Sequence, residues 1–351
     1  MATFSYKNVG IAGLSAAVPL RRFNNYADNP NFSEEDAKAI VDKTGIFERR
    51  VANETTTATD LAFAAAEGLI NQMQLDRNVI DALILVTQTP DYRMPASSFL
   101  LQHQLALPKS CMALDINIGC SGFVVGLNLA YSLLQQENIQ KVMLLNAETR
   151  TKVYSFKDRQ TGFLFGDAAT ACLVSKGDQF GTSYFKIDSD GSKSNYIMAK
   201  SGGYRNPSTP ESFIEREQEN GRFHSDEQGF MDGAGVFEFV ISEVPRHIKE
   251  VLKSSGHEKE DIDHYVFHQA NKFMNEHLVK KLKLDPDKVP FCLDRYGNTS
   301  SVSIPLTIVA ELKDVLKTPK KAVISGFGVG LSLGSAYINL VNPFIPPIIE
   351  V

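Results

Sequence analysis

The chain has 351 residues, of which 36 are basic and 41 are acidic, and its formal net charge is -5. Hydrophobic residues make up 43% and charged residues 22%, which is the composition of a globular protein and excludes a disordered chain. The mildly acidic balance disfavours a nucleic-acid-binding protein, and no apolar run approaches the ~20 residues that span a bilayer. The N-terminus lacks the pattern of a signal peptide, and the four cysteines form no CxxC pair. We therefore expect a cytoplasmic protein with reduced thiols and no membrane insertion.

In the first half of the chain, short apolar runs bounded by turn residues alternate with amphipathic stretches. Buried strands are predicted over residues 81–89, 112–118, 141–147 and 165–174. Apolar residues at helical spacing predict a helix over residues 123–134, directly after the second of these strands. This repeated strand–helix order indicates an α/β architecture.

The second half of the chain repeats the same order of elements. Helices are predicted over residues 236–252, 271–282 and 303–316, and strands over residues 264–268, 321–325 and 335–341. The similar order in the two halves suggests an internal structural duplication. We place the division between residues 1–176 and residues 177–351.

Two segments do not fit this strand–helix order. Residues 205–228 are polar, rich in glutamate and without apolar periodicity, so we predict a surface loop or lid. Residues 342–351 contain three prolines in NPFIPPIIEV, and proline blocks both helices and central strands. We expect this tail to lie extended against the body of the protein.

Cys120 is the strongest candidate for a catalytic residue. It lies where a predicted strand ends, among the small residues Gly119, Ser121 and Gly122, and just before a predicted helix. The positive end of a helix dipole favours a thiolate, and glycines let a substrate approach the backbone closely. A buried core cysteine is the alternative, since free cysteines are among the most buried residues. That structural reading is preferred for the other three cysteines.

Three more features in the second half suggest a site. His268 ends a predicted apolar strand, and such strand ends face the crevice in which α/β sheets bind ligands. Asn298 follows a glycine, a pair that by itself is most often a turn. The glycine loop contains Gly328, Val329 and Gly330 but lacks the Lys-Ser/Thr ending of a phosphate-binding loop. Its glycines would instead admit a substrate to bare backbone N–H groups.

The chain carries these features in the stretches INIGCSGF, VFHQAN, YGNTSSVSIP and SGFGVGLSLGSA, in that order. In this combination it resembles the thiolase superfamily and, within it, the 3-oxoacyl-(acyl-carrier-protein) synthase III family of condensing enzymes. The resemblance extends over nearly the whole chain and includes KTGIFERR near the start and TQTPDYRMP before the cysteine. Thiolases have a second catalytic cysteine in the glycine loop, where this chain has Ser332. Elongating ketosynthases have a second histidine where this chain has Asn298. Plant-type polyketide synthases share the Cys-His-Asn set but are longer and use a coenzyme A extender.

The resemblance implies a five-layer αβαβα thiolase-like fold with two duplicated halves and pseudo-two-fold symmetry. It also implies that Cys120 takes an acyl group from a thioester, with the oxyanion held by backbone N–H groups of Cys120 and of the glycine loop. His268 and Asn298 would polarise a malonyl donor, supplied as malonyl-acyl carrier protein, while CO2 leaves. The product would be a 3-oxoacyl thioester. No metal or bound cofactor is implied.

Further residues acquire roles only through the resemblance. The residues that would contact substrate are Lys43, Met94, Arg159 and Asn271. The loop around Met94 and Pro95 would cross the two-fold axis of a homodimer, and Met94 would line the acyl pocket of the partner. An acidic carrier protein would dock on the basic residues Lys272, Lys280 and Lys281.

Ala39 stands where many members of the family have a tryptophan that stacks on the adenine of coenzyme A. An aromatic face of this kind contributes about 1–3 kcal/mol per stacked base, so its loss predicts weak binding of coenzyme A. The acyl thioester that primes the enzyme could be carried by coenzyme A or by acyl carrier protein. We expect the carrier-protein form, or a less common thioester, and a specialised pathway.

Three other functions remain open from the sequence alone. An acyltransferase of the same fold would pass the acyl group to a hydroxyl or an amine without decarboxylation, and the presence of Asn298 disfavours it. A cysteine hydrolase would share the chain order Cys, His, Asn, but the α/β pattern argues against it. A non-catalytic binding scaffold would require an inert Cys120.

Overall fold

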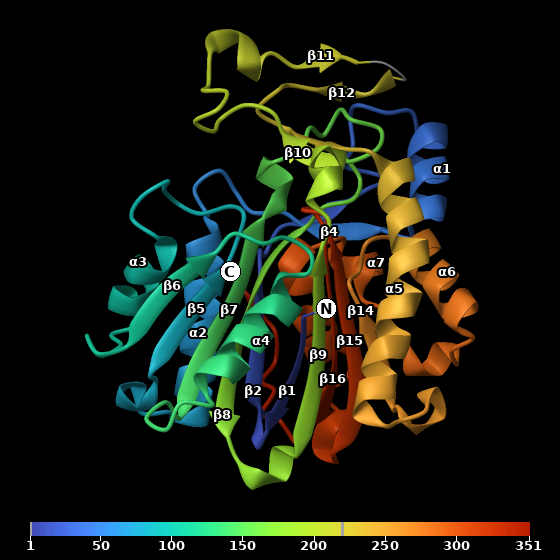
Figure 1. The fold of residues 1–351 in the computed structure, drawn as a ribbon. Helices are drawn as coiled ribbons and strands as arrows, with labels where there is room; N and C mark the ends of the chain where they lie inside the picture. The colour runs from blue at the N-terminus through green and yellow to red at the C-terminus, as the bar shows by residue number, and fades with distance from the viewer. Residues whose placement is uncertain (1, 219–220) are drawn as a thin grey trace.

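The computed structural model describes residues 2–218 and 221–351 and contains two large mixed β-sheets (Figure 1). The first sheet has six strands in the order β17 (Ile349–Glu350), β2 (Val9–Val18), β8 (Asp167–Lys176), β7 (Lys141–Thr149), β5 (Ala82–Val86) and β6 (Met112–Ile116). The second has five, in the order β1 (Ala2–Lys7), β9 (Thr182–Ser189), β16 (Ser332–Leu340), β15 (Lys320–Gly328) and β14 (His264–Phe267). The continuously buried sequence ALILV of β5 is typical of a strand covered on both faces.

Helices form three layers around the two sheets. Helices α4 (Gly122–Leu133) and α8 (Ser303–Glu311) contact strands of both sheets and therefore form the middle layer. Helices α2 (Ala58–Met73) and α3 (Ser97–Gln104) cover the outer face of the six-stranded sheet, and α5 (Gly233–Ser255) covers that of the five-stranded sheet beside α6 (Lys272–Leu282). This is the αβαβα arrangement expected from the sequence.

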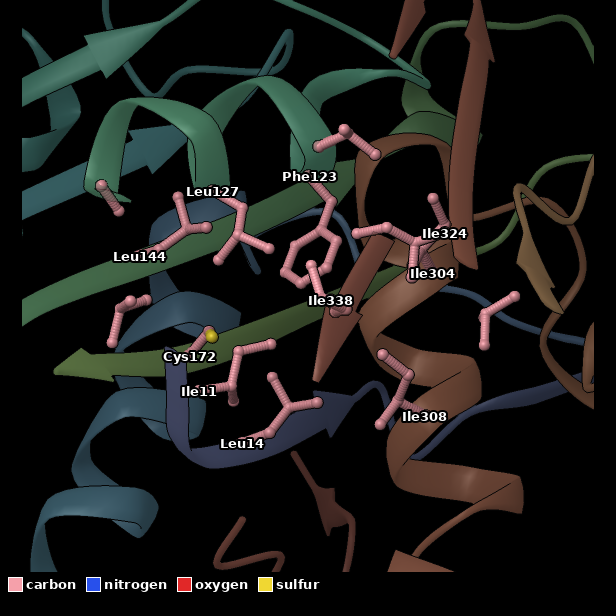
Figure 2. Close-up of a cluster of buried hydrophobic side chains, with 14 of the residues drawn as sticks. Ile11, Leu14, Phe123, Leu127, Leu144, Cys172, Ile304, Ile308, Ile324 and Ile338 are labelled. Carbon is pink, nitrogen blue, oxygen red and sulfur yellow. The ribbon is translucent and has the colours of Figure 1, made fainter. Parts of the chain in front are cut away.

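The central core lies between the two sheets. Helices α4 and α8 are largely apolar, and their side chains interlock with residues from strands of both sheets (Figure 2). Figure 2 labels Ile11, Leu14, Phe123, Leu127, Leu144, Cys172, Ile304, Ile308, Ile324 and Ile338 from this core. Because these two helices are clamped on both sides, the residues just before each of them are held rigidly.

The two halves of the chain are structurally duplicated. The strand order in the two sheets corresponds: β2-β8-β7-β5 in the first sheet matches β9-β16-β15-β14 in the second. Helix α4 precedes β7 as α8 precedes β15, so the segments before α4 and before α8 are equivalent. Each end of the chain joins the other half's sheet, because β1 pairs with β9 and β17 pairs with β2. The division at residue 176 stays a prediction.

The shorter elements gather at one end of the sheets (Figure 1). These are α1 (Glu34–Thr44), α7 (Leu293–Tyr296), the pair β3 (Arg22–Asn24) and β4 (Glu48–Arg50), the pair β10 (Ile197–Ala199) and β13 (Gly229–Met231), and the pair β11 (Arg216–Glu217) and β12 (Phe223–His224). Among the described residues, no helix combines the length and the apolar character needed to cross a membrane.

Several sequence predictions need adjustment at this level. The helix predicted to residue 316 ends at Glu311, and strand β15 extends through Gly328 into the predicted glycine loop. The predicted loop at 205–228 contains the hairpin of β11 and β12, while its residues 219 and 220 lie outside the described ones. The tail lies extended as predicted, and its Phe344 bridges to Gly13. Strands β1, β2 and β9 and helices α1, α2 and α3 were not predicted.

Candidate active site

A single cavity of about 1350 Å³ is lined by residues from both halves of the chain. It lies at the end where the short elements gather, because α1, β10, β12 and the N-terminal ends of α5 and α6 all contribute to its wall. Cys120, His268 and Asn298 all line it. The structure therefore brings the three residues singled out from the sequence to one space.

Cys120 lies in the turn between β6 and the N-terminus of α4, and it is 8% exposed. The turn is closed by the Gly122 N–H, which donates to the Gly119 carbonyl at 2.7 Å. The Cys120 Sγ lies 3.8 Å from the Ser300 Oγ, in the segment just before α8. Cys120 of one half thus contacts the equivalent segment of the other half.

The electrostatics of Cys120 differ from the sequence expectation. Burial raises the pKa of the Cys120 thiol, although the Arg150 cation and a hydrogen bond from Ser300 act in the opposite direction. The backbone N–H of Val329 also bonds to the sulfur and lowers the pKa. The sequence led us to expect a thiolate favoured by the helix N-terminus, whereas the largest influence on this thiol is burial, which raises its pKa. The isolated site therefore holds a thiol that must lose its proton as it reacts.

His268 follows β14 directly and is 2% exposed. Burial lowers its pKa to about 3, so the imidazole is neutral at pH 7. Its Nδ1 lies 2.7 Å from the Ser303 Oγ at the first residue of α8. That contact fixes the ring so that the Nε2 edge is free for a ligand in the cavity.

Asn298 is held by the backbone around it and is 6% exposed. Its Oδ1 accepts a hydrogen bond from the Ser300 N–H at 2.9 Å, which fixes the orientation of the amide. The Nδ2 group has only a long contact to the Ala270 carbonyl, at 3.4 Å, so it can donate to a ligand. The preceding Gly297 has φ 66°, and a side chain there would lie 2.7 Å from the Leu164 carbonyl.

The end of strand β15 approaches Cys120 closely. A Cβ at Gly328 would lie 3.0 Å from the Cys120 Sγ, so only glycine leaves space for an acyl group at this point. Gly328 and Val329 line the cavity, whereas Gly330 does not. With the Val329 N–H directed at the sulfur, this segment can supply backbone donors beside a thioester carbonyl.

One buried cation of the cavity wall, Arg150, was not identified from the sequence. Arg150 is 5% exposed, and its Nη2 donates to the Tyr154 hydroxyl at 3.0 Å. Its charge influences the pKa of both Cys120 and His268. A lone arginine after a strand carries no motif, so only the folded structure reveals its place.

Glu148, the last but one residue of β7, is another buried group near the site. It is fully buried, and burial raises its pKa to about 7 despite the opposing Arg150 cation. It accepts hydrogen bonds from the Gln88 N–H and from the Thr89 and Ser301 hydroxyls. These contacts tie strand β7 to the segment that precedes α8.

The predicted substrate-binding residues are placed differently from one another. Lys43 and Arg159 line the cavity, and Arg159 also pairs with Asp36 at 2.9 Å. Asn271 lines the cavity too, but its Oδ1 caps α6 by accepting from the Met274 N–H at 2.8 Å. Met94 is 74% exposed and does not line the cavity of this single chain.

The predicted docking lysines lie on α6, which borders the cavity mouth. Lys272 and Lys280 are exposed, and Lys281 donates to the Ile241 carbonyl at 2.6 Å. Ala39, at the expected tryptophan position, does line the cavity. An aromatic pair that sequence reasoning missed, Phe237 and Phe273, stacks at 5.3 Å in the same wall.

Possible metal ligands do not gather anywhere in the described part of the chain: no group of three or more His, Cys, Asp or Glu residues could hold an ion. The chemistry available to the described cavity residues is that of a thiol, a neutral imidazole, an amide and backbone N–H groups. Together these can form and break a thioester and stabilise an enolate.

Comparison with known families identifies relatives of this chain. The family model described as 3-oxoacyl-(acyl-carrier-protein) synthase III matches residues 114–191, and the model of the C-terminal part of the same enzyme matches residues 252–340. A β-ketoacyl-(acyl-carrier-protein) synthase III of Staphylococcus epidermidis is 35% identical over 318 residues, covering 89% of this chain and 93% of its own. One of Caldanaerobacter subterraneus is 33% identical over 332 residues, covering 94% and 97%.

Solved structures agree with these relatives. A 3-oxoacyl-(acyl-carrier-protein) synthase of Burkholderia xenovorans superposes with a TM-score of 0.94 at 37% identity, covering 100% of this chain and 99% of the other. The priming β-ketosynthase of a polyketide biosynthetic pathway superposes with a TM-score of 0.81 at 26% identity, covering 97% and 98%. The fold and the sequence therefore point to the same group of proteins.

Proposed function

This chain belongs to the 3-oxoacyl-(acyl-carrier-protein) synthase III family, and on that premise we propose that Cys120, His268 and Asn298 carry out its reaction. The reaction is a decarboxylating condensation. An acyl primer bound to the enzyme is joined to a malonyl thioester, CO2 leaves, and a 3-oxoacyl thioester is formed. The observation that supports this assignment is the convergence of the three side chains on one cavity.

In the first step, the Cys120 sulfur attacks the carbonyl of the acyl thioester. The new bond from carbon to the Cys120 sulfur replaces the bond to the donor sulfur, and the thiol proton of Cys120 leaves with the donor thiol. The oxyanion formed during the attack needs hydrogen-bond donors, which the backbone N–H groups of Cys120 and of the segment around Gly328 and Val329 would supply. The absence of a side chain at Gly328 keeps the space beside the sulfur open.

In the second step, the carbonyl of the malonyl thioester accepts hydrogen bonds from His268 and Asn298. In this structure the Ser303 hydroxyl donates to the Ser300 carbonyl at 2.9 Å; when it turns to donate to Nδ1 of His268 instead, the neutral ring presents its Nε2–H to the substrate. The Asn298 Nδ2 supplies the second donor, since its Oδ1 is occupied by the Ser300 N–H. Two donors on one oxygen favour the enolate that forms as the C–C bond to CO2 breaks.

In the third step, the enolate carbon attacks the acyl group on Cys120. The C–C bond of the product forms, the bond between the acyl carbon and the Cys120 sulfur breaks, and the released Cys120 thiolate takes up a proton from solvent. His268 stays neutral throughout, which agrees with its buried position and its low pKa of about 3.

The partners and the assembly extend this proposal. We expect the malonyl group to arrive on acyl carrier protein, the enzyme to work in the cytoplasm, and the chain to form a homodimer. The open edge of strand β6 supports a dimer, because its described residues pair only with β5. Large apolar side chains are exposed in and around this strand, at Tyr92, Met94, Phe99 and Met112.

Replacing Asn298 with alanine tests the assignment of the two half-reactions. Asn298→Ala should still form acyl-Cys120, observed by intact-mass spectrometry, but should release CO2 from the malonyl thioester roughly 10²–10³ times more slowly. Cys120→Ala is the matched control, because it should form no acyl adduct. Normal CO2 release by Asn298→Ala would support the non-decarboxylating acyltransferase instead.

A further inference from the structure

One buried charge in the cavity is not explained by the steps above. Arg150 is 5% exposed and lies in the wall of the same cavity as Cys120, just after strand β7. The two aromatic rings of Tyr154 and Phe165 stack with their centroids 4.0 Å apart. The Arg150 Cζ lies 5.3 Å from the first centroid and 5.5 Å from the second. The guanidinium is thus fixed against a rigid aromatic pair rather than free to reach solvent.

The guanidinium is short of hydrogen-bond acceptors. It has five N–H groups, but among the described residues it donates only to the Tyr154 hydroxyl at 3.0 Å and to the Gln88 Oε1 at 3.4 Å. Its Nε is buried and makes no hydrogen bond. The second of these two contacts is long, so most of the donor capacity of this cation is unused.

No carboxylate of the described residues forms an ion pair with Arg150. The nearest candidate is Glu148, whose charge acts on Arg150, but the Glu148 oxygens accept from Gln88, Thr89 and Ser301 instead. A buried cation without a hydrogen-bonded anion is unfavourable unless a ligand supplies the missing acceptor. The apolar neighbours Leu164 and Phe327 in the same wall offer none.

We propose that the acyl primer carries an oxygen acceptor, a hydroxyl or a carboxylate, that binds the Arg150 guanidinium while the acyl carbon is attached to Cys120. This rests on the proposed function and specifies its substrate class. A purely hydrocarbon chain would leave the cation buried with its N–H groups unpaired. An oxygen on the chain would complete its hydrogen bonds, and a carboxylate would also balance its charge.

The test compares three four-carbon primers, butyryl, 3-hydroxybutyryl and succinyl, each offered on coenzyme A and on acyl carrier protein. The measured quantity is the rate of acyl-Cys120 formation by intact-mass spectrometry. At least one oxygen-bearing primer should react about tenfold faster than butyryl, or more, since hydrogen bonds to charged groups are among the strong ones. The ranking of 3-hydroxybutyryl against succinyl then distinguishes a neutral from an anionic acceptor. A butyryl rate equal to or above both would overturn the inference.

Two variants separate primer selection from activation of the thiol. Arg150→Leu should lose the preference, so that butyryl becomes the fastest of the three primers. Arg159→Leu, which removes another arginine of the cavity wall, should change all three rates by the same factor. If Arg150→Leu slows all three primers equally and also slows alkylation of Cys120 by iodoacetamide, Arg150 serves only the thiol and the inference is wrong.

The same experiment keeps the two proposals apart. Acylation of Cys120 without any preference among the primers contradicts the inference and leaves the proposed function intact. The absence of an acyl adduct with every primer, on both carriers, contradicts the proposed function itself. The wild-type ranking requires no variant, so the inference stays testable even if Arg150→Leu does not fold.

Discussion

Glu148 provides a test of how the buried charges around the nucleophile act on stability. Its pKa is raised from 4.5 to about 7 by burial, so its native carboxyl holds a proton that the unfolded chain has already lost between these two values. The stability of the native state must therefore fall as the pH rises through this window. For these two pKa values, the ionisation costs the native state about 2.5 kcal/mol more at pH 8 than at pH 5.

Glu148→Gln removes this titration. Measured by urea unfolding, the free energy of unfolding of the variant relative to the wild type should increase by about 2.5 kcal/mol from pH 5 to pH 8. Glu67→Gln is a suitable control, because Arg77 lowers the pKa of Glu67, so its replacement should give no such gain. Parallel pH profiles for wild type and Glu148→Gln would refute the reasoning.

The same variant should change the reactivity of the nucleophile. The negative charge of Glu148 raises the pKa of the Cys120 thiol, so its removal should lower that pKa. We expect Cys120 of Glu148→Gln to react faster with iodoacetamide at pH 8 than in the wild type. An unchanged or slower rate would show that this charge does not act on the sulfur.

Four further predictions concern Cys120, the dimer and the acyl donor. In the wild type, iodoacetamide should modify Cys120 well before the other three cysteines, because only Cys120 of the four lines the cavity. Equal labelling of another cysteine would contradict the proposal that Cys120 is the acylated residue. Met94→Gly should allow the dimeric enzyme to accept longer acyl chains. A monomer by light scattering, or an unchanged chain-length profile, would count against the role of Met94. Given Ala39, an acyl chain on carrier protein should prime Cys120 faster than the same chain on coenzyme A. Phe273→Ala should weaken the binding of a coenzyme A donor if its adenine stacks on the pair Phe237 and Phe273, of which Phe273 is exposed. Efficient priming of the wild type by acetyl-coenzyme A would contradict the preference for carrier protein and support a housekeeping role.

The three residues proposed from the sequence meet in one cavity, and each of them lies beside a backbone feature that is itself visible in the sequence. Cys120 is next to glycines at a strand–helix turn, and Asn298 follows a glycine that needs a positive φ. His268 ends an apolar strand of the kind that period and composition reveal. Because these local backbone requirements also hold in the folded protein, the elements β6, α4 and β14 appear near their predicted places.

Arg150, Glu148 and Ser303 could not be predicted in the same way. Their roles depend on which side chains from distant strands face them, and no local pattern records that. A sequence pattern also shows in which direction a local feature shifts a pKa. It does not show the opposing effect of burial, which arises only in the folded protein. The helix N-terminus at Cys120 suggests a thiolate, whereas burial of the sulfur between both halves raises its pKa. Burial is a property of the whole fold, and it decides the charge of His268 and Glu148 as well.

The duplication explains why this cavity combines two chemistries. The segment before α4 presents a thiol, and the equivalent segment before α8 presents the amide of Asn298 and the hydroxyl of Ser300. Because α4 and α8 are packed against each other's sheets in the central layer, the two segments cannot move apart without disrupting the core. In the proposed reaction, an acyl group on Cys120 and a malonyl group at His268 and Asn298 would therefore be held at a fixed separation. Such positioning is what a carbon–carbon bond-forming step requires, and here it would be provided by the packing of the central core.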